Sequence, residues 1–595
     1  MLMQQLLNLL DQGFSLDCIV ANLLLRILNR RHIKPEDILN DGLRDFLIVN
    51  VRKHLPLLNV EEYSLYDISS FIESSMSDGE KAKGGIVFTP KYICDFIVAD
   101  VLDGYKPGQK ILDPACGCGN FLFSVLNYFR NSGYKLDDIL ANIIYAYDIN
   151  PVFVKYANLL CAIYVVLENP NVKEINTNIR VGDFLSESSK SKYDYIIGNP
   201  PYINNHDLSD EQIGFLKSNY TTTTTGTFNI FYAFIEKGIS HLTDEGSLEF
   251  IIPNNFMYIK SAEPLRVFLS NGIYVDTIID FRDNTIFSPA LTYNCILKLN
   301  RHRKTRVRCA QIGKTSNIAE SLRDIQYEDV QLRGLRHSVW ELTNDVDQER
   351  LRKIESFNIK LGDYIKTGIA TLKDKTYILD GFDDSKIMYY KYADGEKFYI
   401  ETDIVLPFIK VSKYMDPNDI MYIIFPYIIK EGKTIPLDEN ILKQKYPLAY
   451  KYLESQKELL NSRNSPRAPI ISPWYSYGRS QGLSNWGDKI YFSAFSEKPN
   501  FRRINGNKCL YANGYSISGT PVEYHILEKI LNSSIMEFYI EKTSYTISGN
   551  YKCYQKKYLK NFSIPPLSPE NIDFINDHDS EELNCYLEKL YYYNA

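Results

Sequence analysis

An apolar run that ends in two consecutive prolines constrains the fold of this chain more than any other stretch. Residues 193–197 read as a buried strand, and Gly198 is followed by the turn Asn199-Pro200-Pro201-Tyr202. A strand cannot continue through two prolines, because each proline removes an amide donor and fixes φ. The turn should therefore hold the Asn199 side chain and the Pro200 carbonyl in one fixed arrangement at the end of a strand.

Two acceptors beside an aromatic ring can receive a flat group that carries an amino substituent. The amino hydrogens would go to Asn199 and to the Pro200 carbonyl, and the plane would stack on Tyr202. Asn-Pro and Pro-Pro are also ordinary turn formers, so a plain surface turn is the alternative interpretation of these four residues taken alone. The residues upstream of the turn favour a binding site.

An acidic residue ends a strand well before that turn. Residues 111–113 read as a strand that ends in Asp113 and leads into a helix through Pro114-Ala115-Cys116-Gly117-Cys118-Gly119. A dinucleotide fingerprint would need a third glycine where Leu122 stands. A carboxylate at this position repels pyrophosphate but suits a positively charged ligand, so the pattern favours a sulfonium and ammonium compound over NAD.

The next two strands end in the same way. A strand at 143–147 ends in Asp148, which could accept hydrogen bonds from both hydroxyls of a ribose. A strand at 179–181 is followed by Asp183, which could bind an adenine amino group, and by Phe184, which could stack on that ring. Further strands are expected at 246–252, 278–281 and 293–299. The alternation with helices predicts a doubly wound parallel sheet that binds its ligand along one edge.

Two helical stretches precede these strands. Residues 1–80 are predicted to form a helical segment, because apolar residues repeat at i and i+4. Another helix is expected to begin at Thr89 as the N-cap and Pro90 as the first helical residue. The threonine run at 221–225 is expected to be a mobile loop near the site.

The composition is that of a soluble, cytoplasmic protein of several domains. The 595 residues carry a net charge of -6, and the ten cysteines form no paired framework. Cys116 and Cys118 have no second cysteine or histidine pair at zinc-ligand spacing, so we expect no metal. We also expect no targeting signal and no contact with a membrane.

The order of these motifs resembles a known family. Phe88-Thr89-Pro90, the glycine turn, Asn-Pro-Pro-Tyr and a long C-terminal region are similar to the gamma class (TaqI-like) DNA adenine-N6 methyltransferases of restriction–modification systems. The resemblance implies an α/β fold with a doubly wound, seven-stranded, Rossmann-like methyltransferase domain at 81–305. The helical segment 1–80 would precede it, and an α+β target-recognition domain for DNA specificity would follow at 306–595.

The same resemblance implies ligands and residue roles. S-adenosylmethionine would be the cofactor, S-adenosylhomocysteine the product and double-stranded DNA the substrate. Asn199 and Pro200 would accept the hydrogens of a flipped adenine, in a turn completed by Pro201, while Tyr202 and Phe287 would stack on the base. Cofactor contacts are implied for Thr89, Pro90, Asp113, Pro114, Ala115, Gly117, Gly119, Asp148, Ile149, Asp183 and Phe184.

Weaker similarities extend into the C-terminal region. Residues 367–375 and 474–481 are similar to parts of the target-recognition domain in that group. Lys373, Lys375, Arg479 and Gln481 are therefore candidate DNA contacts, although solvated loops would explain each of them equally well. The basic cluster at 301–308 could likewise follow a phosphate backbone or form a solvated strand face.

Other functions remain open from the sequence. RNA adenine and protein glutamine amino groups pose the same chemical problem, although the roughly 290 residues beyond Arg301 favour a large substrate. The chain could also be a non-catalytic or modification subunit that needs a partner, or a fused restriction–methylation enzyme. A cognate restriction endonuclease is a further candidate partner.

Overall fold

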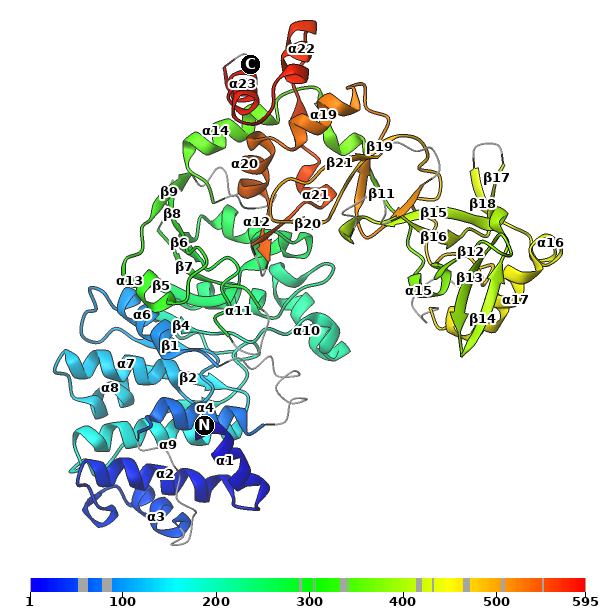
Figure 1. Ribbon diagram of the computed structural model, residues 1–595. Helices are drawn as coiled ribbons and strands as arrows, with labels where there is room; N and C mark the ends of the chain where they lie inside the picture. Colours follow the sequence, from blue (N-terminus) through cyan, green and yellow to red (C-terminus); the bar gives the residue numbers. More distant parts are fainter. Residues whose placement is uncertain are drawn as a thin grey trace. The chain divides into compact units, whose positions relative to one another are not determined.

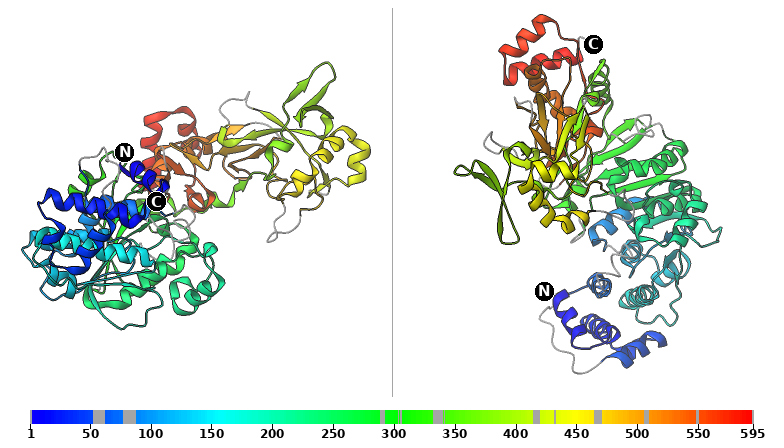
Figure 2. Two further views of the ribbon diagram at one scale, coloured as in Figure 1. Left: turned by 90° about the horizontal axis from the view of Figure 1, so that it is seen from below. Right: turned by 90° about the vertical axis from the view of Figure 1, so that its right-hand side faces the viewer.

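A nine-stranded mixed sheet is the centre of the N-terminal part of the chain. The computed structural model describes residues 2–51, 62–76, 88–287, 292–302, 304, 306–331, 340, 342–413, 420–430, 433–463, 471–504, 509–547 and 550–593 (Figures 1 and 2). The chain divides into two compact units, Met1–Asp345 and Val346–Ala595. Each unit is described by itself.

The strand order of the large sheet is β3-β2-β1-β4-β5-β7-β6-β8-β9. Strands β1 to β5 are parallel, whereas β7 is antiparallel to both β5 and β6. The strands are β1 (Ile111–Asp113), β2 (Ile144–Asp148), β3 (Asn178–Val181), β4 (Tyr193–Gly198), β5 (Leu242–Pro253), β6 (Val275–Asp280), β7 (Asn294–Asn300), β8 (Arg306–Gln311) and β9 (Glu328–Gln331). Seven of these strands lie within the predicted domain 81–305, and β8 and β9 extend the sheet to nine strands beyond residue 305.

Helices cover both faces of this sheet. Neighbouring strand residues point to opposite faces, so Ile196 joins one hydrophobic cluster and Ile197 the other. One cluster contains α6 (Lys91–Val101), α7 (Asn120–Asn131), α8 (Leu136–Asn142) and α9 (Pro151–Glu168). The other contains α10 (Asp210–Asn219), α11 (Phe231–His241) and α12 (Glu263–Gly272). Helix α13 (Ile318–Arg323), later in the chain, contributes Leu322 to the first cluster. This double cover is what the alternation of strands and helices predicts.

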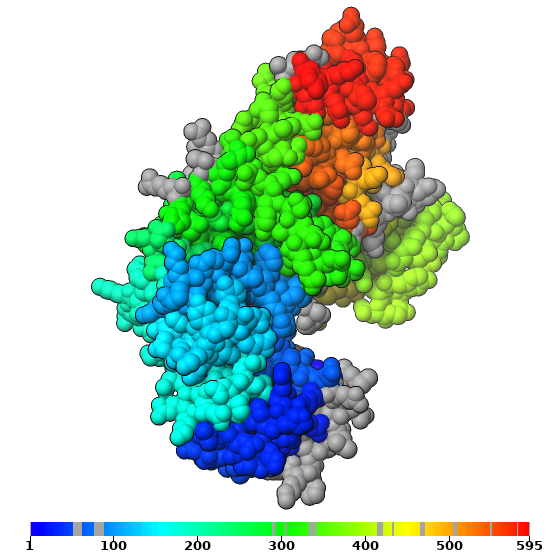
Figure 3. Space-filling model, turned by 90° about the vertical axis from the view of Figure 1, so that its left-hand side faces the viewer, coloured from blue at the N-terminus to red at the C-terminus, as the bar shows by residue number. Residues whose placement is uncertain are grey.

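The N-terminal helices share a core with the sheet. They are α1 (Leu2–Asp11), α2 (Leu16–Arg30), α3 (Asp41–Asn50) and α4 (Leu65–Ser74), and they pack against α7 and α9. The space-filling view shows the dark-blue helices directly against the cyan segment (Figure 3). The helical prediction for 1–80 is met wherever these residues are described; 52–61 and 77–80 lie outside the described residues.

Helix α9 is apolar enough in length and composition to cross a membrane, with a mean hydropathy of 1.5 over 18 residues. It is the one such helix in the described part of the chain, and half of it is buried inside the fold. It contacts β2 and β3 on one side and α3 and α4 on the other. Its apolar character is therefore explained by packing between the sheet and the N-terminal helices.

The second unit mixes short sheets with helices. Its first half contains α14 (Asp345–Ile354), β10 (Ile359–Lys360), β11 (Ile365–Thr367), α15 (Asp374–Tyr377), β12 (Gly381–Asp383), β13 (Met388–Ala393), β14 (Glu396–Ile400), β15 (Val405–Lys410), β16 (Met421–Ile424), β17 (Tyr427–Lys430), β18 (Lys433–Pro436), α16 (Glu439–Lys445), α17 (Pro447–Ser455) and α18 (Lys457–Asn461). Its second half contains β19 (Lys489–Phe492), β20 (Phe495–Ser496), β21 (Arg502–Ile504), β22 (Leu510–Ala512), β23 (Tyr515–Ile517), α19 (Tyr524–Leu531), α20 (Ser534–Thr543), β24 (Thr546–Ile547), β25 (Tyr551–Cys553), α21 (Lys556–Leu559), β26 (Ser563–Ile564), α22 (Pro569–Asp577) and α23 (Ser580–Tyr592). The two halves contribute most of two separate hydrophobic clusters. A role for this unit in target recognition stays a prediction.

The threonine run at 221–225 was predicted to be a mobile loop, but its first three residues are folded into the protein. Thr221–Thr223 form a short 3-10 helix, in which Thr222 and Thr223 are buried. The Thr223 hydroxyl donates a hydrogen bond to the Leu216 carbonyl at 2.7 Å. The run is thus anchored to α10, because its hydroxyls find backbone acceptors inside the fold.

Candidate functional site

The carboxyl ends of β1 and β4 touch each other. The two strands are parallel neighbours, with Leu112 opposite Ile196. Gly198 has a φ of +152°, and a Cβ added to it would lie 2.9 Å from Asp113 Oδ1. Glycine is required here, because a side chain would displace Asp113. The proline turn and the glycine turn, predicted from separate stretches, therefore form one site.

Asp113 is a buried carboxyl with an unused acceptor. It is 1% exposed, and its Oδ1 accepts a hydrogen bond from the Ala115 N–H at 3.1 Å. Its Oδ2 is buried and has no hydrogen-bond partner within the described part of the chain. Burial, together with the charge of Asp148, raises the pKa of Asp113 to about 8. A buried acceptor without a donor is costly, so this atom is set to receive a ligand donor.

Asp148 orders the glycine turn. Its Oδ2 accepts from the Gly117 N–H at 2.9 Å and its Oδ1 from the Asn150 N–H at 2.8 Å, while burial raises its pKa. Gly117 and Gly119 have positive φ values of +54° and +98°, which glycine adopts without strain. The approach of a ligand to this backbone stays a prediction, because side chains of Glu73 and Phe123 lie against the positions that a Cβ would take at Gly117 and Gly119.

Sequence reasoning missed Glu73, which lies on α4 and whose carboxylate accepts a hydrogen bond from the same turn. Its Oε1 accepts a hydrogen bond from the Cys118 N–H at 3.1 Å. The only signal in the sequence is an acidic residue directly after the apolar pair Phe71 and Ile72, which marks a charge on a buried helix face.

The ends of β2 and β3 combine exposed apolar and buried aromatic side chains. Ile149 is 71% exposed, and Val181 beside Asp148 is 55% exposed. Asp183 is exposed, and its Oδ1 accepts from the Leu185 N–H. Phe184, in contrast, is 2% exposed and packs against Phe234 and His241. It lies in the core between β3 and α11, and its stacking on an adenine stays a prediction.

Thr89 contacts the proline turn directly. The Asn199 Nδ2 donates a hydrogen bond to the Thr89 hydroxyl at 3.0 Å, and Thr89 is buried. The prediction of Thr89 as a helix N-cap was wrong: α6 begins at Lys91, and Pro90 occupies the N-cap position. The hydroxyl orients the Asn199 amide in place of capping the helix.

Tyr202 is fixed at its hydroxyl. The hydroxyl donates to the Ile251 carbonyl at 3.0 Å and accepts from Asn294 Nδ2 at 3.2 Å, and burial raises the Tyr202 pKa well above its usual value. The ring makes edge-to-face contacts with Phe231 and Phe287, at centroid distances of 6.2 and 6.3 Å. The structure thus joins Phe287 to the turn, as a residue that is itself 2% exposed. Asn294 is a second residue that sequence reasoning missed.

In the second unit, two distant stretches form one surface. The Gly478 N–H donates to the Thr371 carbonyl at 3.1 Å, and the Arg479 N–H donates to the Ala370 carbonyl at 3.0 Å. Gln481 donates from its side chain to the Gly368 carbonyl. Exposed side chains on these stretches are Lys375, Arg479 and Gln481, while Lys373 is half-buried. The predicted DNA contacts therefore lie on paired loops.

The basic cluster is neutralised within the first unit. Arg301 pairs with Asp244, Arg306 with Asp345, and Lys304 and Arg308 with Asp276. Arg303 lies outside the described residues. The described part of this cluster is an ion-paired strand face.

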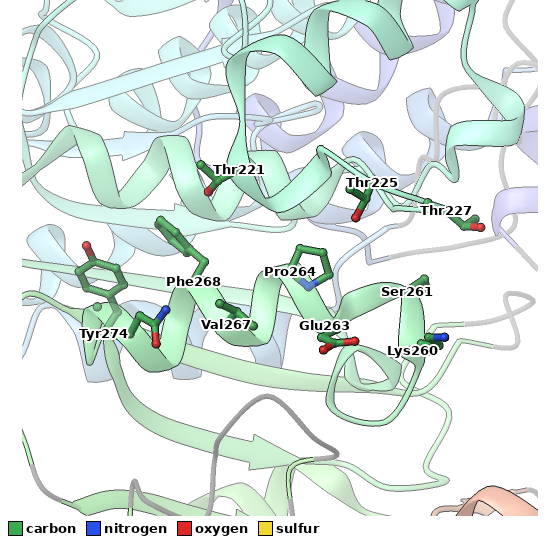
Figure 4. Close-up of a pocket in the computed structure, with 13 residues that line it drawn as sticks. Thr221, Thr225, Thr227, Lys260, Ser261, Glu263, Pro264, Val267, Phe268 and Tyr274 are labelled. Carbon is green, nitrogen blue, oxygen red and sulfur yellow. The ribbon is translucent and has the colours of Figure 1, made fainter.

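A cavity of 1070 Å³ lies between the threonine run and α12 (Figure 4). Thr225 and Thr227 lie on one side of it, and Ser261, Pro264 and Phe268 on the other. None of the predicted site residues lines it. The cavity is therefore separate from the glycine and proline turns.

Comparison with known proteins identifies related chains. Residues 142–287 match the family model described as Eco57I restriction-modification methylase. The chain is 24% identical over 601 residues to the Type II restriction enzyme and methyltransferase RM.Eco57I of Escherichia coli, which covers 85% of this chain and 59% of that protein. It is 24% identical over 529 residues to the Type II methyltransferase M.BstVI of Geobacillus stearothermophilus, covering 81% and 90% of the two chains.

The fold is also similar to that of solved structures. The Type IIL restriction-modification enzyme MmeI, solved in complex with DNA, is similar with a TM-score of 0.60 at 13% identity. The similarity covers 93% of this chain and 78% of that chain. At this identity the likeness shows the fold alone.

Proposed function

We propose that this chain, which belongs to the Eco57I-type restriction–modification methylases through residues 142–287, methylates the N6 amino group of adenine in double-stranded DNA. The observation that carries the proposal is the contact of Gly198 with Asp113. It brings an acceptor turn for an amino group against a buried carboxyl group that can accept from a positively charged methyl donor. Methylation needs these two groups side by side.

The residues of the glycine turn fit S-adenosylmethionine. The buried Asp113 Oδ2 can accept from an ammonium group, and Asp148 is adjacent for ribose hydroxyls. Gly117 and Gly119 hold the turn in its positive-φ conformation, and the exposed Ile149 offers an apolar surface to an adenine ring. When bound, this cofactor supplies a methyl group on a positively charged sulfur. Pro90, Asp183 and Phe184 are proposed as further contacts, whereas Thr89 is proposed to orient Asn199.

The proline turn would activate the target nitrogen. An exocyclic amino nitrogen is a poor nucleophile, because its lone pair is delocalised into the ring. Asn199 and the Pro200 carbonyl would accept both hydrogens, draw the nitrogen toward tetrahedral geometry and stabilise the positive charge that develops on it. The nitrogen would then take up the methyl group that the cofactor supplies and would release one proton to solvent, with Asn199 and the Pro200 carbonyl holding it in place. No covalent bond to the protein is needed.

A target adenine must leave the duplex to reach this turn. Unstacking it costs a few kcal/mol, which an aromatic platform partly offsets. The Tyr202 ring is held by the Ile251 carbonyl and by Asn294, so it is oriented before the base arrives. We propose Tyr202 as the platform, with Phe287 supporting it from the side.

The second unit would recognise the DNA sequence. The paired loops at 367–375 and 474–481 present Lys375, Arg479 and Gln481 to solvent, which suits contacts to phosphates or base edges. Since the chain spans 59% of the length of the Escherichia coli relative, its place in a larger restriction–modification assembly is part of the proposal. A cognate restriction endonuclease is the proposed partner, and the cytoplasm the proposed location.

Modification-sensitive sequencing of DNA from expressing cells tests the proposal. We expect N6-methyladenine in one sequence context with the wild type and none with Asn199→Ala. Asn171→Ala, at an exposed asparagine after α9, is the matched control and should methylate normally. Purified Asn199→Ala should still bind the cofactor. Modified RNA or protein in place of DNA would contradict the substrate assignment, and equal loss of binding and transfer would contradict the role of Asn199.

A further inference from the structure

The N-terminal helical segment reaches into the glycine turn through Glu73. This residue is 8% exposed, and its Oε1 accepts from the Cys118 N–H at 3.1 Å. A Cβ added to Gly117 would lie 2.8 Å from the same oxygen. Glycine at 117 is therefore required by the approach of Glu73 as well as by its positive φ.

Helix α4 holds Glu73 in a fixed position. The Ser69 hydroxyl donates to Asn120 Oδ1 at 2.8 Å, and the hydroxyls of Tyr66 and Ser124 lie 2.6 Å apart. Both contacts join α4 to α7, the helix that follows the glycine turn. Leu65, Ile68, Phe71 and Ile72 of α4 are buried in the shared core. Two polar contacts and an apolar face thus fix the carboxylate against the turn.

Three carboxyl groups meet at this turn; those of Glu73 and Asp113 are buried and that of Asp148 is half-buried. The amide of Gly117 is bound by Asp148 and the next amide by Glu73, while Asp113 keeps one oxygen without a donor. Within the described residues no lysine, arginine or histidine forms an ion pair with any of the three. Burial and the charge of Asp148 raise the pKa of Glu73 to about 7. A positively charged ligand would remove this mutual repulsion.

The arrangement favours an ammonium group over a metal ion. The described residues contain no group of three or more histidine, cysteine, aspartate or glutamate side chains placed to hold a metal. One oxygen of Glu73 is already bound to a backbone N–H, and the same holds for Asp113. Each carboxyl group therefore offers one further acceptor, and an ammonium group has three donors in a compact space.

We propose that Glu73 is a further cofactor-binding residue, which accepts a hydrogen bond from the α-ammonium group of S-adenosylmethionine. The inference rests on the proposed function, since it assumes that cofactor. It gives the N-terminal helical segment a direct part in the cofactor site. It also predicts that the cofactor stabilises the packing of α4 on α7.

Calorimetric binding to Glu73→Gln tests the proposal. Glutamine keeps the shape and the acceptor for Cys118 N–H but removes the negative charge. We expect the Kd for S-adenosylmethionine and for S-adenosylhomocysteine to rise about tenfold or more, the size of a lost charge-assisted hydrogen bond. Methylthioadenosine, which lacks the ammonium group, should bind as it does to the wild type. Glu36→Gln, at an exposed glutamate of the same segment, is the control and should change nothing.

The unfolding temperature of the Glu73→Gln protein distinguishes a cofactor-binding role of Glu73 from a purely structural one. The ligand-free Glu73→Gln protein should unfold at the wild-type temperature or higher, because a neutral amide is easier to bury than a charge. Unchanged affinity for S-adenosylmethionine would overturn the inference, and so would equal weakening of all three ligands, which would mark Glu73 as a structural residue. If the wild type binds none of them, the cofactor assignment fails first and the inference fails with it.

Discussion

The carboxyl edge of the large sheet has two halves: the ends of β1 and β2 carry acidic side chains, whereas the end of β4 carries neutral ones. At the ends of β1 and β2, Asp113 is buried and Asp148 is half-buried, and burial raises the pKa of both. At the end of β4, the groups beside the Gly198 contact are the neutral side chains of Asn199, Thr89 and Tyr202. One half consists of carboxyl groups whose ionised form needs a cation, and the other is a set of oriented dipoles.

The difference corresponds to two kinds of ligand. A sulfonium and an ammonium group need negative charge, whereas the amino group of a base is neutral until it reacts. Amide and carbonyl oxygens orient a neutral amine and stabilise the partial positive charge that develops on it during the reaction. In the proposed reaction, the sheet edge separates binding of the cation from activation of the amine.

Gly198→Ala should disrupt both halves at once. The added Cβ would collide with Asp113 Oδ1 and the residue would be held at a φ of +152°, a strain of roughly 1–3 kcal/mol. We expect loss of cofactor binding by calorimetry, loss of methyl transfer, and a lower unfolding temperature. Gly214→Ala is the control, because Gly214 lies in α10 with open space around its Cα and should tolerate the methyl group. Wild-type binding by Gly198→Ala would show that the two halves are independent.

Thr89→Val should separate the two halves. Valine keeps the volume but leaves Asn199 Nδ2 without its acceptor, so we expect turnover to fall about tenfold with little change in cofactor affinity. Thr89→Ser, which keeps the hydroxyl, should restore most of the turnover. Steady-state kinetics and calorimetry together measure the split. A loss of cofactor affinity as large as the loss of turnover would assign Thr89 to the cofactor half.

The stability of the ligand-free protein should also depend on pH, because of the carboxyl groups in the acidic half of the sheet edge. The pKa values of Glu73 and Asp113 are raised to about 7 and about 8, above their values in the unfolded chain. Their stabilising contribution is therefore present at low pH and is lost as pH rises through about 7 to 8. The unfolding temperature of the first unit should fall by a few degrees over this range, and Glu73→Gln should flatten the fall.

The increase in unfolding temperature caused by S-adenosylmethionine should grow as pH rises, whereas the unfolding temperature of the ligand-free protein falls. The cationic ligand binds the ionised carboxylates, so its thermal shift should increase as pH rises through the same range. Differential scanning calorimetry with and without ligand measures both trends. A thermal shift that is independent of pH would mean that these carboxyl groups do not meet the ligand's positive charge.

Much of the first unit could be predicted from local sequence. The strands β1 to β7 and their polar ends follow from apolar runs that stop at aspartate, asparagine or proline, since these residues end strands by their own chemistry. The positions of Phe184 and Thr89 could not be predicted in this way. Whether an aromatic ring faces the edge or the core, and which partner a hydroxyl finds, depends on side chains distant in sequence.

In the second unit, still less of the tertiary arrangement could be predicted from local sequence. The stretches 367–375 and 474–481 were identified separately, and backbone hydrogen bonds pair them. Arg463 adds side-chain hydrogen bonds to the carbonyls of Thr371 and Ser476, and no local pattern marks that arginine. Contacts between stretches so far apart in the chain leave no periodic pattern in the sequence from which they could be predicted.

The sequence by itself determined where the strands end and which chemical groups stand there. It did so because proline, glycine and buried apolar runs restrict the backbone over a few residues. Only the tertiary structure decided that Gly198 rests on Asp113, that Thr89 orients Asn199, and that Glu73 reaches the glycine turn from the N-terminal helices. These contacts join residues far apart in the chain, and they exist because parallel strands align their carboxyl ends while packed helices bring remote side chains to the same edge.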